Sequence, residues 1–584
     1  MINHRSLRED QIQGRTRTEC LSVSLADDQD REEIYRIRHE VYACELQQHS
    51  ANPATSLRDS LDSANIYIIA RVAGKTAGFV SITPPGLPSY SIDKYFDRAS
   101  LPFAFDDGLH EVRLLTVIRS HRGSEVAALL MYAAFRWVES HGGSHIVAIG
   151  RREILDLYFK VGLRPVGKSV RSGLVDYDLL HATVLEGRAA LLPFRGTLAR
   201  LQGKVSWELN FSFYKPAECF HGGAFFQAIG ESFHTLDRKA TVINADVLDA
   251  WFAPSPLVTA ALQEHLGWLL KTSPPTGCEG MVEAIAHARG VKAMNILPGA
   301  GSSDLIFRAL RHWVSAESHV LILDPTYGEY AHVLEHVIGC TVDRLSLARE
   351  HGYEVDLDRL RTALRDKYDV VVLVNPNSPT GRHISRPVLE GILREVAGRT
   401  RVWVDETYVE YAGPNESLER FAAQTDNVII CKSMSKVYAL SGARAAYLCA
   451  GAHQLEALRA ITPPWVVSLP AQVAVTRALA DPGYYADRYA ETHLLRESLR
   501  ERLEALDWQM MPGIANFLLG QLPEHFPTAK QLAMACQQHG LFLRDASSMG
   551  SNLGRRTIRV AVKDAATNDR MVAIISAVQR TVVH

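Results

Sequence analysis

The stretch that decides the fold reads Ser433-Met434-Ser435-Lys436-Val437-Tyr438-Ala439-Leu440-Ser441-Gly442-Ala443-Arg444. A lysine follows two hydroxyl residues, and an arginine stands eight positions after the lysine. A lysine amine can form an imine with an aldehyde, while hydroxyl and guanidinium groups bind phosphate. Pyridoxal phosphate (PLP) offers both an aldehyde and a phosphate. Serines and lysines are also common on solvated loops, so this motif alone is weak evidence for PLP. The motifs that precede it strengthen the prediction.

A glycine turn at residues 297–301 leads into an apolar helix. Backbone N–H groups of Gly301, Ser302 and Ser303 would lie at the helix start, where unpaired donors and the helix dipole favour a phosphate. The alternative interpretation is a simple helix cap by one of the two serines.

Two predicted buried strands end in polar residues. The apolar run at residues 370–374 is followed by Asn375-Pro376-Asn377-Ser378-Pro379-Thr380-Gly381, and the run at residues 402–404 is followed by Asp405. Ligands of open α/β sheets bind at the carboxyl ends of such strands. A buried carboxylate needs a partner, and a pyridinium nitrogen is suitable. Asp405 could otherwise cap a helix, and Tyr408 could be a core aromatic residue.

Together these motifs resemble the fold-type I PLP enzymes of the class I/II aminotransferase family, in its branch of histidinol-phosphate aminotransferases and threonine-phosphate decarboxylases. The resemblance covers about the last two-thirds of the chain. It implies an α/β fold, with a large domain whose mainly parallel sheet is flanked by helices and a small C-terminal α+β domain. It also implies that Lys436 binds PLP covalently, that Asp405 pairs with the pyridine nitrogen and that Tyr408 donates to the ring oxygen.

The same resemblance assigns the other ligands of the cofactor and the substrate. Arg559 is expected to grip the substrate carboxylate, for which a bidentate fork is suited, with Arg555 and Arg556 as rivals. An exposed strand arginine is the alternative interpretation. The residues expected to hold the phosphate or the ring are Gly301, Ser302, Ser303, Tyr327, Asn377, Ser378, Asp405, Tyr408, Ser433, Ser435, Lys436 and Arg444.

The chain departs from the family pattern in places that bear on the substrate. Ser378 stands where the family usually has asparagine, so the bond to the ring oxygen is expected to be weaker or to come from Asn377 or Asn375. Asp246 and Trp251 stand in an amino-terminal arm where relatives carry an Asn-x-Asn-Pro segment that contacts substrate. The identity of the amino-acid substrate therefore should not be taken over from histidinol phosphate.

Composition fits a multidomain globular enzyme. A chain of 584 residues should hold more than one domain. The net charge of −2 gives no reason to expect a nucleic acid or an anionic membrane as partner. The apolar stretches are too short to span a bilayer, and the first residues form no signal peptide. Eight scattered cysteines without a C-x-x-C pair predict reduced thiols and a cytoplasmic location, and no metal site is expected.

The first third of the chain predicts a second α/β domain. A strand around residues 111–118 runs through a glycine turn into a helix, an order that again suits an anion. The order of elements resembles the GCN5-related N-acetyltransferase (GNAT) superfamily, and in particular the N-acyl amino acid synthases and acyl-homoserine-lactone synthases. This implies a site for acyl-CoA or an acyl-carrier thioester, with Glu111 on the Glu-x-Arg strand and Tyr158 as general acid. Alternatively, Glu111 is a surface strand acid and Tyr158 a core tyrosine. Glu125 would repel a pyrophosphate, which keeps a carrier thioester or a docking role open.

We therefore expect a GNAT-like domain at residues 1–200, an aromatic connecting segment at 201–240 and a PLP domain at 241–584, with its small lobe from about 485. The expected activity is transamination of an amino acid joined to N-acylation, in specialised biosynthesis, by a homodimer. Alternatives are decarboxylation, γ-elimination or γ-replacement on S-adenosylmethionine, and a PLP-sensing regulator that is not an enzyme.

Overall fold

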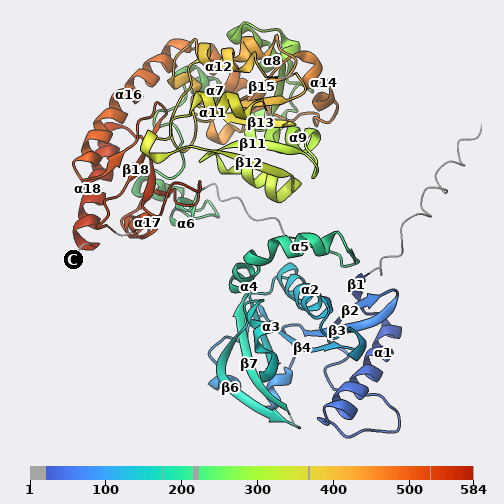
Figure 1. Ribbon diagram of the computed structural model, residues 1–584. Helices are drawn as coiled ribbons and strands as arrows, with labels where there is room; N and C mark the ends of the chain where they lie inside the picture. The colour runs from blue at the N-terminus through green and yellow to red at the C-terminus, as the bar shows by residue number, and fades with distance from the viewer. Residues whose placement is uncertain are drawn as a thin grey trace, which may run out of the picture. The chain divides into compact units, whose positions relative to one another are not determined.

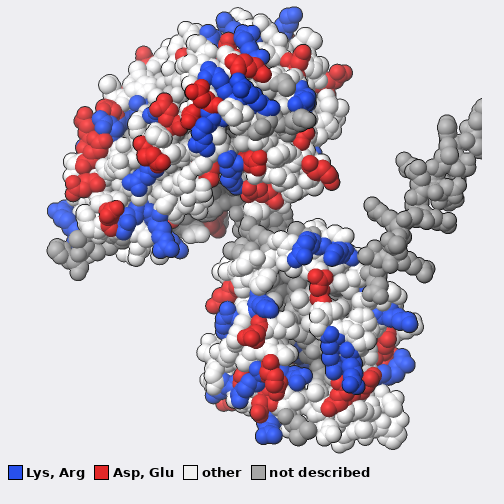
Figure 2. All heavy atoms as spheres, viewed as in Figure 1, with Lys and Arg blue, Asp and Glu red and all other residues white. Residues whose placement is uncertain are grey.

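The chain divides into two compact units, Met1–Lys215 (unit 1) and Pro216–His584 (unit 2). A computed structural model describes residues 21–173, 175–214, 222–365, 368–396, 398–526 and 528–582 (Figure 1). Among these residues, no helix is both long and apolar enough to cross a membrane. On the face shown in Figure 2, acidic and basic side chains are intermixed over both units.

Unit 1 is built on an eight-stranded sheet in the order β6-β7-β5-β4-β3-β2-β1-β8. Neighbouring strands are antiparallel, except for the parallel pairs β4–β5 and β1–β8. Helix α2 (Val126–Ser140) buries its apolar residues against this sheet. The strands are β1 (Leu21–Leu25), β2 (Ile66–Val72), β3 (Lys75–Thr83), β4 (Leu109–Val117), β5 (His145–Arg151), β6 (Arg164–Ser172), β7 (Val175–Thr183) and β8 (Val205–Trp207).

The strand and helix that the sequence predicted for this unit are present in the structure. The strand expected around residues 111–118 is confirmed as β4, and the helix after the glycine turn is α2. Before β2, helix α1 (Asp28–Arg38) continues directly into a π-helix (His39–Glu45). Shorter helices α3 (Leu155–Phe159), α4 (Val184–Leu191) and α5 (Arg195–Gln202) complete the unit.

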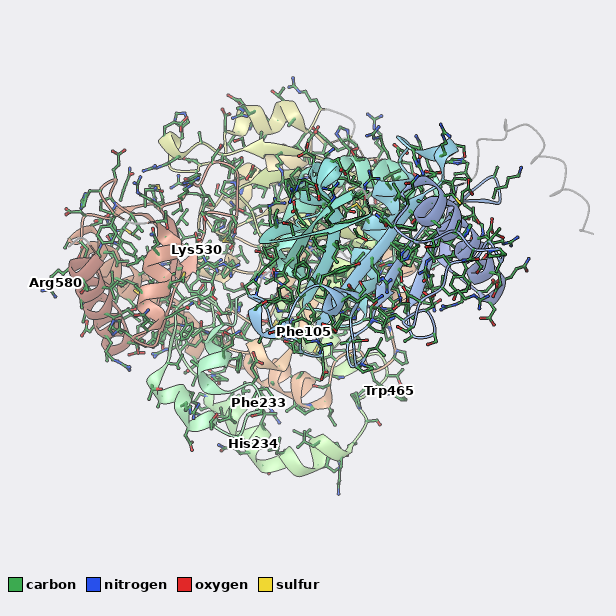
Figure 3. All side chains as sticks on the ribbon, turned by 90° about the horizontal axis from the view of Figure 1, so that it is seen from below. Phe105, Phe233, His234, Trp465, Lys530 and Arg580 are labelled. Carbon is green, nitrogen blue, oxygen red and sulfur yellow. The ribbon has the colours of Figure 1, made fainter. Side chains whose placement is uncertain are left out.

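The expected aromatic segment at residues 201–240 does not behave as one piece. Strand β8 lies in the sheet of unit 1, and Phe213 is buried there with its carbonyl oxygen accepting hydrogen bonds from Tyr132 and Arg136. Helix α6 (Phe225–Ile229) belongs to unit 2, and Phe220 lies outside the described residues. Exposed aromatic side chains of unit 2 include Phe233 and Trp465 (Figure 3).

Unit 2 contains a seven-stranded sheet in the order β10-β16-β15-β14-β13-β11-β12. Strands β11 to β15 run parallel, and β16 is antiparallel to both β15 and β10. In Figure 1, helices α8 (Glu279–Arg289), α9 (Ser302–Trp313), α12 (Arg386–Leu393) and α14 (Ala452–Ala460) surround this sheet. The strands are β10 (Ile296–Gly299), β11 (His319–Asp324), β12 (Thr341–Ser346), β13 (Val370–Val374), β14 (Arg401–Asp405), β15 (Val428–Ser433) and β16 (Ala446–Cys449).

A smaller sheet closes the carboxyl-terminal part of unit 2. Its order is β17-β18-β21-β20, formed by Gln509–Met510, Phe517–Gln521, Thr557–Ala561 and Arg544–Asp545. The long helices α16 (Pro482–Glu504) and α18 (Ala565–Val582) lie side by side there, with α17 (Ala529–Gln537) beside them (Figure 1). Strand β9 (Ile243–Asn244) pairs in parallel with β19 (Leu541–Phe542), so the amino-terminal arm of unit 2 returns to this lobe.

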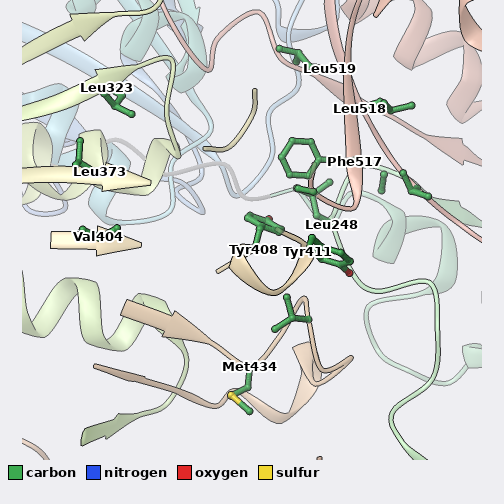
Figure 4. Packing of buried hydrophobic residues seen from close by; sticks show 14 of the residues in the cluster. Leu248, Leu323, Leu373, Val404, Tyr408, Tyr411, Met434, Phe517, Leu518 and Leu519 are labelled. Carbon is green, nitrogen blue, oxygen red and sulfur yellow. The ribbon is translucent and has the colours of Figure 1, made fainter. Parts of the chain in front are cut away.

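One hydrophobic core joins the arm, the small lobe and the large sheet. Leu248 of the arm, Tyr408 after β14 and Phe517 of β18 belong to the same buried cluster (Figure 4). The rings of Tyr408 and Phe517 meet edge to face, with centroids 5.4 Å apart. This packing fixes the loop after β14 beside the arm, at the place where the cavity described next opens.

Candidate active site

A cavity of about 1140 Å³ opens at the carboxyl ends of the parallel strands of unit 2. Strands β11, β13, β14 and β15 end at Asp324, Val374, Asp405 and Ser433, and each of these terminal residues lines the cavity. Parallel strands bring their carboxyl ends to one edge of a sheet, which is where ligands of this architecture bind.

Lys436 lines this cavity three residues after the end of β15. Its Nζ lies 2.9 Å from Oδ1 of Asp249, an arm residue far away in sequence. Burial works to raise the pKa of the Asp249 carboxyl, but the charge and hydrogen bond of Lys436, together with Ser441 and Lys563, hold that pKa below its usual value. Sequence reasoning missed Asp249 as a site residue, because an aspartate in a loop is ordinarily solvated.

The start of helix α9 forms an anion cradle in the cavity wall. Ser302 and Ser303 line the cavity together with Ser433, Ser435 and Arg444. Gly301 has a φ of +92°, and a Cβ at this position would collide with the Arg444 guanidinium. No side chain caps the helix, so the interpretation of a simple serine cap is wrong. The cradle therefore fits a phosphate group, held by backbone N–H groups and one guanidinium.

Asp405 is almost fully buried and is held by three donors. Its Oδ1 accepts hydrogen bonds from the N–H and the hydroxyl of Thr407, at 2.9 and 2.6 Å. Its Oδ2 accepts from the Tyr330 hydroxyl at 2.7 Å. Burial raises the pKa of this carboxyl, while the donors oppose the shift. A cation that entered the cavity beside Asp405, such as a protonated pyridine nitrogen, would pair with it.

Two tyrosines predicted to contact the cofactor also line the cavity. Burial raises the pKa of both the Tyr408 and the Tyr327 phenol. The Tyr327 hydroxyl donates to Oε2 of Glu329 at 2.7 Å, and Ser303 donates to the same oxygen at 3.0 Å. Glu329 is fully buried and lines the cavity, and no motif in the sequence pointed to it.

The turn after β13 presents one of its polar side chains to the cavity. Ser378 lines it, whereas neither Asn375 nor Asn377 does. The Asn375 amide bonds the backbone of Ile384. Asn377 donates to the carbonyl oxygen of Pro325 and to the Thr380 hydroxyl. Both asparagine side chains therefore hold the turn together.

Arg559, on β21, is the arginine of the three candidates that reaches the cavity. It is 7% exposed, and Arg555 and Arg556 do not line the cavity wall. Its guanidinium donates to Ser378 Oγ at 3.3 Å and to the carbonyl oxygen of Asp246 at 3.0 Å. Its Nε has no hydrogen-bond partner among the described residues. Burial lowers the Arg559 pKa to about 10, which a bound carboxylate would offset.

The arm contributes Val247 and Leu248 to the cavity wall, but not Asp246 or Trp251. The Asp246 carboxylate pairs with Arg544 of β20 at 3.4 Å, and burial raises its pKa. The Trp251 indole donates to the Thr492 hydroxyl on α16 at 2.8 Å. In this chain, these two predicted substrate contacts therefore lie behind the wall rather than in it.

Unit 1 has its own cavity, of about 520 Å³. Strands β4 and β5 pair along Leu109–Glu111 and His145–Val147, and residues farther along both strands line the cavity. Tyr158 lines it, and burial raises the pKa of its phenol. Glu111 does not line it: it is fully buried and accepts hydrogen bonds from the N–H groups of Ser91 and Ile92. The interpretation of Glu111 as a surface acid is wrong.

The parallel sheet with a reversed strand, the lysine after β15 and the anion cradle at α9 define a fold-type I PLP-dependent enzyme. A family model, aminotransferase class I and II, matches residues 248–575. The chain belongs to that family, for which PLP is the expected cofactor.

Similar proteins include histidinol-phosphate aminotransferase 1 of Thiobacillus denitrificans, 29% identical over 349 residues that cover 58% of this chain and 88% of the relative. The aromatic amino acid aminotransferase of Rhodococcus jostii is 28% identical over 307 residues, covering 52% and 82%.

Solved structures show the same fold. The histidinol-phosphate aminotransferase of Sinorhizobium meliloti in complex with pyridoxal-5'-phosphate matches with a TM-score of 0.55 and 23% identity, covering 64% of this chain and 98% of that one. The L-threonine-O-3-phosphate decarboxylase of Porphyromonas gingivalis matches with a TM-score of 0.51 and 20% identity, covering 57% and 99%.

Proposed function

We propose that unit 2 transfers the amino group of an α-amino acid with PLP held at Lys436. One observation carries the proposal: Lys436, Asp405, the α9 cradle and Arg559 all line a single cavity. A reactive amine, a partner for a ring nitrogen, a phosphate site and a carboxylate site thus occur together. This is the set of groups that amino-acid chemistry on PLP needs.

When bound, PLP supplies the aldehyde and the electron-withdrawing ring. Lys436 Nζ would hold the aldehyde carbon and, once released, move the proton at the substrate Cα. Asp405 would hold the ring nitrogen protonated, and Tyr408 would donate to the ring oxygen. Ser433, Ser435 and Arg444, with the backbone N–H groups of Ser302 and Ser303, would bind the phosphate.

Arg559 would orient the substrate through its carboxylate. Its guanidinium is buried and partly bonded to protein acceptors, so a carboxylate can complete its hydrogen bonding. A fixed carboxylate determines which bond at Cα stands perpendicular to the ring. Transamination requires the C–H bond in that position, and decarboxylation requires the C–COO bond.

Visible absorption during titration of the purified protein with amino acids and S-adenosylmethionine tests this proposal, beside Lys436→Ala. We expect a cofactor band in the wild type that the variant lacks, and a shift of that band with one class of amino acid. Mass spectrometry of the product then distinguishes a keto acid from an amine or an elimination product. A wild-type protein that binds no PLP would refute the proposal.

We further propose that unit 1 is a GNAT-like N-acyltransferase that uses acyl-CoA or an acyl-carrier thioester. The supporting observation is the cavity beside the parallel strands β4 and β5, with the Tyr158 phenol in its wall. Tyr158 would return a proton to the leaving thiolate. The link between the two units would raise the effective concentration of a shared amine.

Thiol release from acyl-CoA and acyl-carrier substrates in the presence of amino acids tests this second proposal. Tyr158→Phe is expected to lower thiol release by about 10- to 100-fold, whereas Lys436→Ala should leave it unchanged. Equal rates in Tyr158→Phe and wild type would refute the role of Tyr158. We also propose that the protein works as a cytoplasmic homodimer.

A further inference from the structure

A chain of hydrogen bonds runs behind the cavity from Trp403 to Asp405 through Tyr330. The Trp403 indole N–H donates to the Tyr330 hydroxyl oxygen at 2.8 Å, and the Tyr330 hydroxyl lies 2.7 Å from Asp405 Oδ2. Tyr330 and Trp403 are fully buried, and Asp405 is 3% exposed. Asp405 and Trp403 belong to the same strand, β14, while Tyr330 comes from α10 (Gly328–Ala331).

The direction of these bonds follows from the chemistry of the donors. An indole N–H can only donate, so the Tyr330 oxygen must accept from Trp403. The single phenol hydrogen is then available for Asp405. Asp405 consequently faces the Tyr330 donor at one oxygen and two Thr407 donors at the other. Each of these donors favours the ionised carboxylate, which burial disfavours.

We propose that Tyr330, oriented by Trp403, is a positioning residue that keeps Asp405 ionised and directed at the cofactor ring. The inference rests on the proposed PLP function of the cavity. Its geometric basis is that the two aromatic rings cannot turn freely: the Tyr330 and Trp403 rings meet at 70° with centroids 6.4 Å apart. The ring of Tyr327, which lines the cavity, packs against the Tyr330 ring at 80°, with centroids 6.0 Å apart.

Other titratable groups also face Asp405 and must be considered in any pH dependence. They are Glu329 on α10, Tyr327 before it, Tyr408 after β14 and Cys431 on β15. Burial raises the pKa of the Tyr330, Tyr327, Tyr408 and Cys431 groups, so these four stay neutral near pH 7. A pH effect that depends on Asp405 is therefore isolated by comparison with Asp405→Asn.

The experiment measures PLP affinity by absorbance titration between pH 5.5 and 9 in wild type, Tyr330→Phe, Asp405→Asn and the double variant. Tyr330→Phe should weaken PLP binding at neutral pH by about 10- to 100-fold, as expected for one hydrogen bond to a charged group. Its loss of affinity on acidification should begin about one pH unit higher than in wild type. In the Asp405→Asn background, Tyr330→Phe should have no further effect.

A matched control separates this role from a merely structural one. Tyr368 is also buried, and its hydroxyl donates to the Asp343 carboxylate at 3.0 Å, away from the cavity wall. Tyr368→Phe should lower thermal stability without moving the pH profile. Trp403→Phe keeps the phenol but frees its orientation, and should give a smaller shift in the same direction as Tyr330→Phe.

Three results would overturn the inference. An unchanged pH profile in both Tyr330→Phe and Trp403→Phe would overturn the inference. If the wild type still binds PLP, the proposed function stands without it. Equal effects of Tyr330→Phe in the wild-type and Asp405→Asn backgrounds would show that the phenol does not act through Asp405. A wild-type protein that binds no PLP would refute the proposed function itself, and the inference with it.

Discussion

Lys436 and Asp249 form an ion pair, with Nζ and Oδ1 2.9 Å apart, that joins the reactive amine to the amino-terminal arm. Lys563 also contacts the arm here, through the Asp249 carbonyl oxygen at 3.4 Å. Burial lowers the pKa of Lys563 to about 8. The arm therefore controls the electrostatic surroundings of the residue on which the proposed chemistry depends.

Replacing Asp249 with asparagine should speed the reaction of Lys436 with PLP. To attack the aldehyde, Lys436 Nζ must leave its ion pair with Asp249, and the variant removes that ion pair. We expect an increase of about twofold to fivefold, the size of one partly exposed ion pair, measured by stopped-flow absorbance after mixing apoprotein with PLP. Asp246→Asn, in the same arm but not in contact with Lys436, is the control. A slower reaction in Asp249→Asn would contradict this account.

Gly301→Ala should weaken PLP binding by at least about tenfold, because its φ of +92° and the nearby Arg444 guanidinium leave no room for a Cβ. Equilibrium titration with PLP measures the effect. Gly442→Ala is the matched control, since a Cβ at Gly442 would meet nothing within 4 Å. Equal affinities of the two variants would show that the α9 cradle does not hold the phosphate.

Arg559→Lys should raise the KM for the amino-acid substrate by roughly 10- to 100-fold, because lysine loses the planar fork that fits a carboxylate. PLP content should stay constant, since Arg559 is not expected to bind the cofactor. Steady-state kinetics and absorbance measure both quantities, with Arg555→Lys as the control. An unchanged KM would move the carboxylate site elsewhere in the cavity.

The buried carboxyl of Glu406 should make the stability of the protein depend on pH. Burial beside Glu419 raises its pKa from 4.5 to about 7, even though Lys432 opposes the shift. Folding therefore takes up a proton between about pH 4.5 and 7. The free energy of unfolding should fall as pH rises through this window, by an amount on the order of 1–3 kcal/mol.

Glu406→Gln should flatten that slope. Compared with wild type at the same pH, the variant should fare better at pH 8 than at pH 5. Chemical denaturation at several pH values measures the slope, with Glu390→Gln on α12, at a partly exposed glutamate, as the control. A slope as steep in Glu406→Gln as in wild type would assign the pH dependence to other groups.

Exposed aromatic and aliphatic side chains predict where a second copy binds. Trp268 and Leu270 of α7 (Pro256–Lys271) are 55% and 71% exposed, and Trp465 is 54% exposed. We expect a dimer in sedimentation velocity that Trp268→Glu dissociates. Leu494→Glu on α16, a helix other than α7, replaces a leucine that is 74% exposed and should leave the dimer intact. A wild-type monomer with full activity would contradict the homodimer.

The sequence by itself determined the family and the local elements. Residues 370–374 form β13, residues 402–405 lie in β14, and the glycine turn at residue 301 begins α9. These features are local, because an apolar run, a terminal acid and a glycine with positive φ are specified by neighbouring residues. The lysine motif could likewise be recognised from its spacing.

Only the tertiary structure decided which side chains meet in the cavity and directly behind it. Asp249 lies beside Lys436, Glu329 beside Tyr327 and Tyr330 beside Asp405, because the arm, α10 and β14 are folded together. No local sequence pattern distinguishes Asp249, Glu329 and Tyr330 from solvated acids or core aromatic residues. Conversely, Asp246 and Trp251 stand in a motif-like segment but turn toward Arg544 and Thr492. Proximity between distant segments depends on how a whole core packs, which residue spacing alone does not encode.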